Sequence, residues 1–261
     1  MRRLLMKSAL LAVMVFGFMS QAQAASCDGL PSYEDLKSAL TTARKEANGG
    51  LNLDMWGTVV NRDGVVCAVV YTGADRGSQW PGSRVISAQK ANTANAFSLD
   101  GLSLSTANLY SAVQPGGPLF GLQESNPVDV KAAYDGSPNA FGSARDPMVG
   151  HAVGGVNVFG GGLALYNAEG KIIGALGVSG DTSCADHNIA WRARNGLKLD
   201  FVGAGVAPTK NDQIIYDVAG GKSKGGFGHP TCGGTENTVA KSLPATSVVA
   251  PVAEESKPAA E

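Results

Sequence analysis

The run Gly174-Ala175-Leu176-Gly177-Val178-Ser179-Gly180-Asp181-Thr182 decides the fold of this chain. It ends a predicted strand, in LALYNAEGKIIGALGV, and begins a predicted helix, in SCADHNIAWRARNGL. A glycine-rich turn from a strand into a helix presents backbone N–H groups and a helix N-terminus to whatever lies above it. We therefore expect Gly180 and Asp181 to belong to a polar binding surface.

Two hairpins and several helices surround this run. Residues 56–60 and 65–72 are predicted strands, and the Asp63-Gly64 turn between their β-branched stretches is a strong hairpin signal. A second hairpin joins residues 163–166 to 172–178. Helical spacing of apolar residues, with start and stop signals, predicts four helices, at 32–47, 83–98, 105–113 and 184–195. This order predicts an α+β domain in which helices flank an antiparallel β-sheet.

The first 24 residues have the pattern of a cleaved signal peptide. Arg2, Arg3 and Lys7 precede an apolar stretch that ends at Met19, and the small-residue motif Ala22-Gln23-Ala24 follows. The stretch is short for a membrane span, which needs about 20 apolar residues. We expect residues 1–24 to be removed and the mature chain to be exported to the periplasm.

The rest of the chain has the length of one domain with additions. An N-terminal arm at 25–31 precedes a domain at 32–200, which contains a long loop at 124–150 rich in Asn, Pro, Asp and Gly. Loops of that length are often functional. A glycine-rich extension follows at 201–239, with a predicted strand near 211–218. The composition of residues 240–261 predicts a disordered tail.

The charge pattern argues against nucleic acid as a partner. The whole chain has 21 basic and 22 acidic side chains, a formal net charge of −1. Without Arg2, Arg3 and Lys7, 18 basic residues face 22 acidic ones, which makes the net charge −4. A mildly acidic chain without a basic cluster does not fit a phosphate backbone.

Four cysteines in a chain predicted to be exported indicate disulfide bonds. Three pairings are possible. We favour Cys27–Cys67 and Cys184–Cys232, because the first would fix the N-terminal arm to a strand and the second would fix the C-terminal extension to the domain.

The three histidines are the candidate ligands for a haem iron. His187 follows the glycine-rich turn, and His151 follows the long loop, from which it could reach the same pocket. The alternative for each is a polar surface residue. His229 could contact haem, or could chelate a metal with Cys232, but no second pair of ligands completes a tetrahedral set and a disulfide at Cys232 would remove this option.

The order and spacing of three blocks resemble the GlcG/HbpS-like haem-binding family, also called haem-degrading. These blocks are ISAQKANTANAF at 86–97, VQPGGPLFGL at 113–122 and GALGVSGDT at 174–182. The resemblance covers about residues 32–196. It implies an α-β-α domain with an antiparallel sheet, assembly into homo-oligomers, and haem as the cofactor. It identifies no axial ligand, because members of the family use different residues.

Three functions remain open at this point. The first is an exported haem-binding protein with a role in haem handling or breakdown, in which His187 or His151 binds the iron. The second is a periplasmic small-molecule-binding or accessory protein of an oxidation pathway that does not use haem. The third is an enzyme with Asp181 and His187 as an acid–base pair, for which the sequence indicates no substrate.

Overall fold

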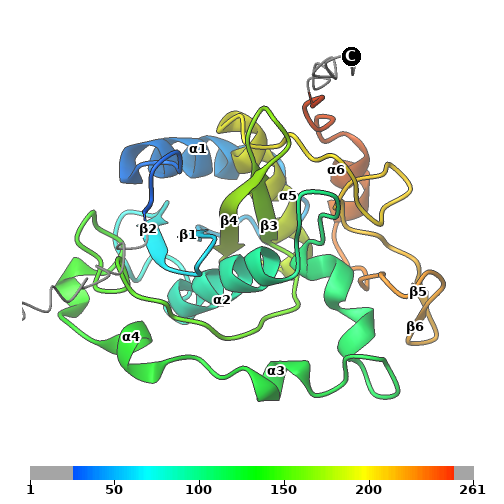
Figure 1. The fold of residues 1–261 in the computed structure, drawn as a ribbon, viewed down its shortest axis with the longest axis horizontal. Helices are drawn as coiled ribbons and strands as arrows, with labels where there is room; N and C mark the ends of the chain where they lie inside the picture. The colour runs from blue at the N-terminus through cyan, green and yellow to red at the C-terminus, as the bar shows by residue number, and fades with distance from the viewer. Residues whose placement is uncertain (1–25, 250–261) are drawn as a thin grey trace, which may run out of the picture.

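The structure is a computed structural model that describes residues 26–249. The predicted signal peptide and residues 250–261 therefore lie outside the described residues. An antiparallel sheet of four strands, in the order β2-β1-β4-β3, lies between helices on its two faces (Figure 1). The strands are β1 (Trp56–Asn61), β2 (Val66–Tyr71), β3 (Gly162–Tyr166) and β4 (Ile172–Ser179). The prediction of an α+β fold with a flanked antiparallel sheet is confirmed.

Both predicted hairpins form, and the sheet joins them through their inner strands. β1 pairs with β4 along its whole length, with Val59 opposite Leu176. Gly64 occupies the first turn with φ of 77°, a conformation that L side chains rarely adopt. The two hairpins therefore make one sheet in which β2 and β3 are the edge strands.

Helix α2 (Ser83–Ala96) covers one face of the sheet at very close range. A Cβ atom added to Gly177 would lie 1.9 Å from the Ser87 carbonyl oxygen, and one added to Gly162 would lie 2.5 Å from that of Lys90. The helix offers alanines to the sheet, and Ala91 is fully buried. Two glycines of the sheet and a small-residue helix face thus allow backbone to pack against backbone.

Helices α1 (Tyr33–Lys45) and α5 (Ser183–Gly196) cover the other face. Ser32 caps α1, and its hydroxyl and the Asp35 carboxylate form a reciprocal capping box. Leu36 and Leu40 of α1 pack with residues of all four strands and with Ile189 of α5 in the largest apolar cluster. This cluster is the core of the domain.

The long loop is irregular, and it runs along the α2 side of the sheet to the β2 edge (Figure 1). Helix α3 (Leu122–Ser125) leads into it, and it contains α4 (Val130–Tyr134) and the 3-10 turn η3 (Pro138–Ala140). Two further 3-10 turns, η1 (Thr106–Leu109) and η2 (Ser111–Val113), precede it, where one short helix was expected. We call residues 124–150 the excursion.

A buried ion pair holds the excursion against α2. The Arg84 guanidinium, on the first turn of α2, donates from Nε to Asp146 Oδ2 at 2.8 Å and also binds the second carboxylate oxygen. The Asp146 carboxylate in addition accepts from the N–H groups of Gly142 and Met148, at 2.6 and 2.9 Å. One carboxylate therefore organises the end of the excursion.

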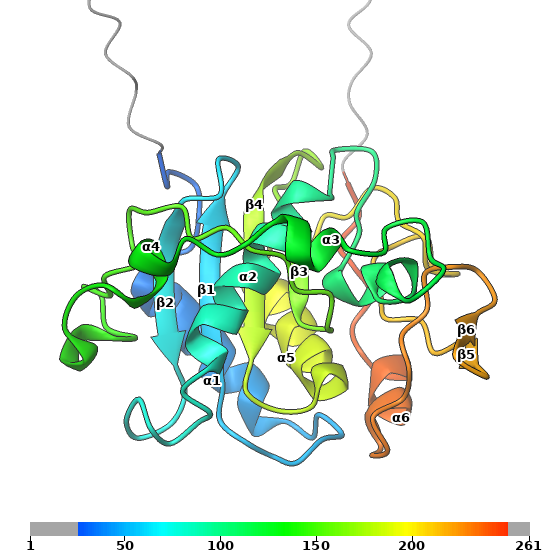
Figure 2. The same ribbon diagram turned by 90° about the horizontal axis from the view of Figure 1, so that it is seen from below.

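The C-terminal extension lies beyond the opposite edge of the sheet, beside α5 (Figure 2). It contains β5 (Val218–Ala219), β6 (Lys222–Ser223) and α6 (Glu236–Lys241). The prediction of a strand over 211–218 was wrong, because backbone and side chains of this segment bond to α5 and η1 instead of to a sheet edge.

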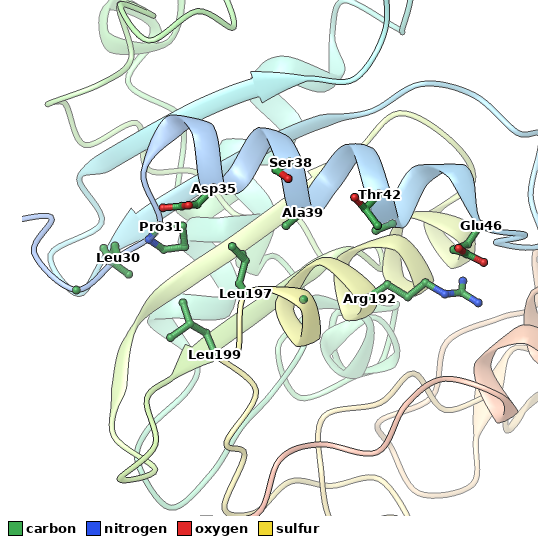
Figure 3. Close-up of a pocket in the computed structure, with 13 residues that line it drawn as sticks. Leu30, Pro31, Asp35, Ser38, Ala39, Thr42, Glu46, Arg192, Leu197 and Leu199 are labelled. Atoms are coloured by element: carbon green, nitrogen blue, oxygen red, sulfur yellow. The ribbon is translucent and has the colours of Figure 1, made fainter.

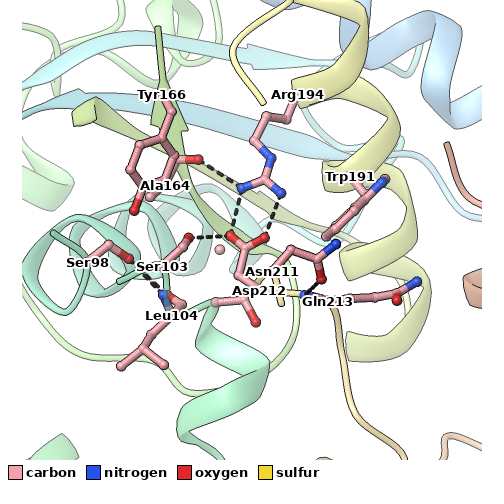
Figure 4. Close-up of polar contacts among 12 residues, drawn as sticks. Ser98, Ser103, Leu104, Ala164, Tyr166, Trp191, Arg194, Asn211, Asp212 and Gln213 are labelled. Carbon is pink, nitrogen blue, oxygen red and sulfur yellow. Dashed lines mark hydrogen bonds and ion pairs between the residues drawn. The ribbon is translucent and has the colours of Figure 1, made fainter. Parts of the chain in front are cut away.

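A buried ion pair joins the extension to α5. Both Arg194 and Asp212 have fully buried side chains, and they pair through two contacts of 2.7 Å (Figure 4).

The extension continues further than the sequence predicted. Residues 240–249, expected to begin the disordered tail, lie against the domain. Ala240 is buried, and the Pro244 carbonyl accepts a hydrogen bond from Trp191 Nε1 at 2.8 Å. The apolar residues of α6 and an indole donor on α5 give this segment partners that its composition does not indicate.

Disulfides join Cys27 to Cys67 and Cys184 to Cys232, the pairing that the sequence analysis favoured. The first fixes the N-terminal arm to β2, and the second fixes the extension to the first turn of α5. Within residues 26–249, none of the helices has the length and apolarity that a membrane crossing requires.

Candidate functional site

The glycine-rich turn is buried and has partners inside the protein. A Cβ atom on Gly180 would lie 2.3 Å from the Asp54 carbonyl oxygen. The Asp181 carboxylate accepts from the N–H groups of Leu51 and Leu53, at 2.8 and 3.0 Å, and the Asp181 N–H donates to the Asp186 carboxylate at 2.8 Å. This packing does not support Gly180 and Asp181 as a binding surface, because their polar groups close the fold around α5.

His187 lies on α5 with its side chain fully buried. Its Nε2 accepts a hydrogen bond from the Ile214 N–H at 3.1 Å, and its Nδ1 has no partner. Burial lowers the pKa of His187 to about 3, so the ring is neutral near pH 7. The extension covers the nitrogen that an iron would need, and this packing argues against His187 as a haem ligand.

His229 is also buried, within the extension. Its Nδ1 lies 2.7 Å from the Pro230 carbonyl oxygen and its Nε2 lies 3.3 Å from Ser183 Oγ. Burial lowers the pKa of His229 to about 4. The Tyr110 ring packs against the imidazole at a tilt of 53°, with centroids 5.0 Å apart. A macrocycle has no access to this imidazole, so the structure does not support haem contact at His229.

His151 has a different environment, because its side chain is exposed. It lies at the end of the excursion, where its backbone carbonyl accepts from the Val66 N–H of edge strand β2 at 3.0 Å. His187 lies on α5, which covers one face of the sheet, and His229 lies in the extension. Neither residue lines the cavity that His151 lines, so the expectation that His151 and His187 reach one pocket was wrong. The sheet separates the exposed histidine from the two buried ones.

The imidazole of His151 lines a cavity of about 650 Å³ beneath the excursion. Lys131 and Arg145 provide cationic side chains in its wall, and Ala132 and Val149 provide apolar ones. Asp129, Asp135 and Asp146 add acidic groups, of which Asp146 is paired with Arg84. The cavity therefore combines a nitrogen ligand, apolar surface and cations that suit a carboxylated ligand.

An aromatic cavity of about 370 Å³ lies on the other side of the excursion. Trp56, Tyr134 and Phe141 contribute the aromatic walls, and Arg76 lies in its lining. The Arg84 guanidinium stacks on the Phe141 ring at 3.7 Å from its centroid. No local sequence pattern predicts this cavity, because its walls come from β1, α2 and the excursion.

A third cavity, of about 610 Å³, is a groove between α1 and the end of α5 (Figure 3). Asp35, Thr42, Glu46 and Arg192 make it polar, and Leu197 and Leu199 close its apolar end. Among its described lining residues there is no histidine, cysteine, methionine or tyrosine. It therefore offers none of the side chains that commonly bind haem iron.

A buried pair of charges lies under the glycine-rich turn. Lys90 Nζ is 2.8 Å from an Asp186 carboxylate oxygen and donates to the Val178 carbonyl at 3.0 Å. Burial raises the pKa of Asp186 to about 6 although Lys90 favours its charged form. Because both side chains are enclosed, Lys90 ties α2 to β4 and α5 and does not serve as an exposed anion site.

The acid–base pair of Asp181 and His187 has no support in this arrangement. Backbone N–H groups occupy the Asp181 carboxylate oxygens and His187 Nε2. General acid–base catalysis requires a group within hydrogen-bond reach of the substrate proton. Both groups are instead internal, and they hold loops in place.

Comparison with known families places the chain. Residues 32–195 match the family model described as "Haem degrading protein HbpS-like". The chain therefore belongs to the HbpS-like family. The match ends at the last turn of α5 and so contains the excursion but not the C-terminal extension. No match was found among proteins of curated function.

Several solved structures are similar to this chain. The Klebsiella pneumoniae protein ORFY is 25% identical with a TM-score of 0.43, over 63% of this chain and 86% of that one. A PduOC–haem complex is 24% identical with a TM-score of 0.44, over 64% and 94%. A double mutant of Streptomyces reticuli HbpS is 14% identical with a TM-score of 0.39, over 72% and 97%.

Proposed function

We propose that this chain is an exported haem-binding protein that takes part in haem handling, and that haem binds beneath the excursion. The observation that carries the proposal is the exposed imidazole of His151 in a cavity of about 650 Å³. The description of the family as haem-degrading supports haem as the ligand. The buried state of the other two histidines leaves His151 as the histidine with access to solvent.

The residues around His151 fit the chemical groups of haem. The imidazole of His151 would supply the axial nitrogen. Lys131 and Arg145 would pair with the two propionates, and Ala132 and Val149 would contact the macrocycle. Bound haem would supply a redox-active iron. Asp146, through Arg84, would keep the excursion in place around it.

A haemin titration followed by absorbance tests the proposal. The mature chain from Ala25 should give a saturating Soret band at one haem per chain. His151→Ala should remove the band or weaken binding at least tenfold, while His187→Gln and His229→Gln should retain it. A band of equal affinity in His151→Ala would contradict the assignment of the ligand, and no band in the wild type would contradict haem binding itself.

The aromatic cavity favours a second candidate function, the binding of a small flat anion in place of haem. Its three aromatic walls and the neighbouring Arg76 suit a flat molecule with one negative charge. Native mass spectrometry of the purified protein would detect a retained molecule. Tyr134→Ala should release that molecule and leave the haemin titration unchanged, because Tyr134 lines only the aromatic cavity of the two.

Export and assembly are parts of the same proposal. The pattern of residues 1–24 and the two disulfides support an oxidising compartment such as the periplasm. The family resemblance supports a homo-oligomer, and Trp80, Phe120 and Val130 are exposed apolar side chains. Cell fractionation with N-terminal sequencing, and light scattering of the mature chain, would test the two points.

A further inference from the structure

The corner between α5 and the extension brings two sulfurs and an imidazole together. Cys184 Sγ, Cys232 Sγ and a ring nitrogen of His229 all lie within 4.8 Å of one another. Cys184 and Cys232 are joined in a disulfide, which uses the valence of both sulfurs. In this oxidised form the corner offers no thiolate, and the imidazole is the one ligand of the three that remains.

We propose that reduction of the Cys184–Cys232 disulfide converts this corner into a Cys₂His site for a thiophilic divalent cation such as Zn²⁺. A dithiol reductant supplies two electrons and two protons, the S–S bond breaks, and the reductant becomes a disulfide. The two cysteine thiols then release their protons to water as the metal binds. The site is thereby controlled by the redox state of the protein.

The distances fit a tetrahedral cation. Zn–S bonds of about 2.3 Å and Zn–N bonds of about 2.0–2.1 Å place neighbouring ligand atoms about 3.5–3.8 Å apart. Cys184 Sγ is 3.9 Å from His229 Nδ1, and Ser183 Oγ lies 3.5 Å from Cys232 Sγ and 3.3 Å from His229 Nε2. Once the S–S bond is broken, the sulfurs need to separate by about 2 Å. The Ser183 hydroxyl or a water can complete the tetrahedron.

The residues around these three ligands resemble the outer shell of a metal site, which orients the ligands by hydrogen bonds. His229 Nδ1 donates to the Pro230 carbonyl at 2.7 Å, which fixes the ring and leaves the lone pair on Nε2. Cys184 lies in the first turn of α5, where the helix dipole favours a thiolate. Cys232 is partly exposed and Cys184 is buried, so a reductant would reach the disulfide from the Cys232 side.

A buried carboxylate gives an independent indication of a cation. Glu236 is 1% exposed, and its Oε1 accepts from the Cys232 N–H at 2.6 Å. Its Oε2 has no hydrogen-bond partner, and Glu236 takes part in none of the ion pairs found among residues 26–249. An unpaired buried carboxylate is costly. A cation held by the adjacent sulfurs would offset that cost without requiring Glu236 as a ligand.

The second disulfide is a matched control. Cys67 Sγ is 3.6 Å from the Val65 carbonyl oxygen. Within the described part of the chain, Cys27 and Cys67 belong to no cluster of residues that could bind a metal ion. The sequence separation of this disulfide, 40, is close to the 48 of Cys184–Cys232. Reduction should therefore create a metal site at one disulfide and not at the other.

The test uses the mature chain with Zn²⁺ and Co²⁺ as probes, before and after reduction by a phosphine. The phosphine takes its oxygen from water, which also supplies the two protons of the thiols. The reduced protein should bind one Zn²⁺ per chain, and Co²⁺ should show the sulfur-to-metal charge-transfer band of a thiolate site. The oxidised protein should bind at least 100-fold more weakly.

Variants distinguish metal binding at this site from metal binding by the free thiols of an unfolded chain. Cys27→Ser with Cys67→Ser should retain the Co²⁺ band, and Cys184→Ser should remove it. His229→Gln should weaken Zn²⁺ binding at least tenfold. Metal binding that is equal in oxidised protein, that is absent after reduction, or that depends on Cys27 and Cys67 would overturn the proposal. The haemin titration has no part in this test, so the two proposals can fail separately.

Discussion

The excursion at 124–150 runs along the α2 side of the sheet to the β2 edge, and the C-terminal extension from residue 201 lies beyond the β3 edge (Figure 2). Each is anchored by a buried Arg–Asp pair. They differ in what they leave open. The extension buries both of its neighbouring histidines, whereas the excursion leaves His151 exposed over a cavity. The same anchoring chemistry thus supports a closed surface at one edge and an accessible one at the other.

The largest expected effect comes from breaking either anchor. Asp212→Ala and Asp146→Ala should each lower the free energy of unfolding by about 3–5 kcal/mol, because each leaves a buried guanidinium without its partner. Hydrogen exchange should accelerate in the extension for the first variant and in the excursion for the second. Lys171→Ala is the control, since its pair with Asp100 is exposed and should contribute about 1 kcal/mol or less.

The second-largest effect on the free energy of unfolding distinguishes the two regions, because the extension is held by a disulfide and the excursion is not. Replacement of Cys184 and Cys232 by serine should cost about 2–4 kcal/mol in metal-free buffer. Chemical denaturation with hydrogen exchange would measure it, and the loss of protection should be confined to the extension and the start of α5. An equal loss in the excursion would show that the two regions are coupled.

A smaller effect depends on pH. The pKa of His187 falls from 6.5 to about 3 on folding, so the unfolded chain binds a proton between these values that the folded chain does not. His187 therefore favours unfolding as pH drops from 6.5 to 3, by about 2 kcal/mol at pH 5. Asp186, whose pKa is raised to about 6, acts in the opposite direction over about pH 3.8 to 6.

Comparison of wild type with His187→Gln isolates this contribution, because both proteins contain Asp186. The glutamine carbonyl can accept from the Ile214 N–H in place of Nε2. Urea denaturation at pH 7 and pH 5 should show a smaller acid loss of stability in the variant. The same acid loss in both proteins would mean that His187 is not buried in the neutral form.

Much of the fold could be predicted from the sequence because its signals are local. The Asp63-Gly64 turn, the cap at Ser32 and the small face of α2 each depend on neighbouring residues. The role of Gly180 was misjudged, since a glycine that admits neighbouring backbone and a glycine that admits a ligand look alike in a sequence. A Cβ atom on Gly180 would lie 2.3 Å from the Asp54 carbonyl oxygen, which shows that it is the first kind.

The candidate site could not be predicted to the same extent. His187 and His151 both follow glycine-rich segments, and nothing local separates them. The exposure of the two imidazoles differs because of distant residues. The Ile214 N–H, 27 residues beyond His187, bonds the His187 ring. Arg84, 62 residues before Asp146, anchors the excursion next to His151. Such pairings depend on the tertiary fold, and they decide which imidazole reaches solvent.

The central claim is that haem binds under the excursion and not beside the extension. Hydrogen exchange of the mature protein with and without one equivalent of haemin tests it most directly. The account predicts slower exchange in residues 129–151 and no change in residues 183–190 and 211–232. Protection of the latter segments, with residues 129–151 unchanged, would contradict it.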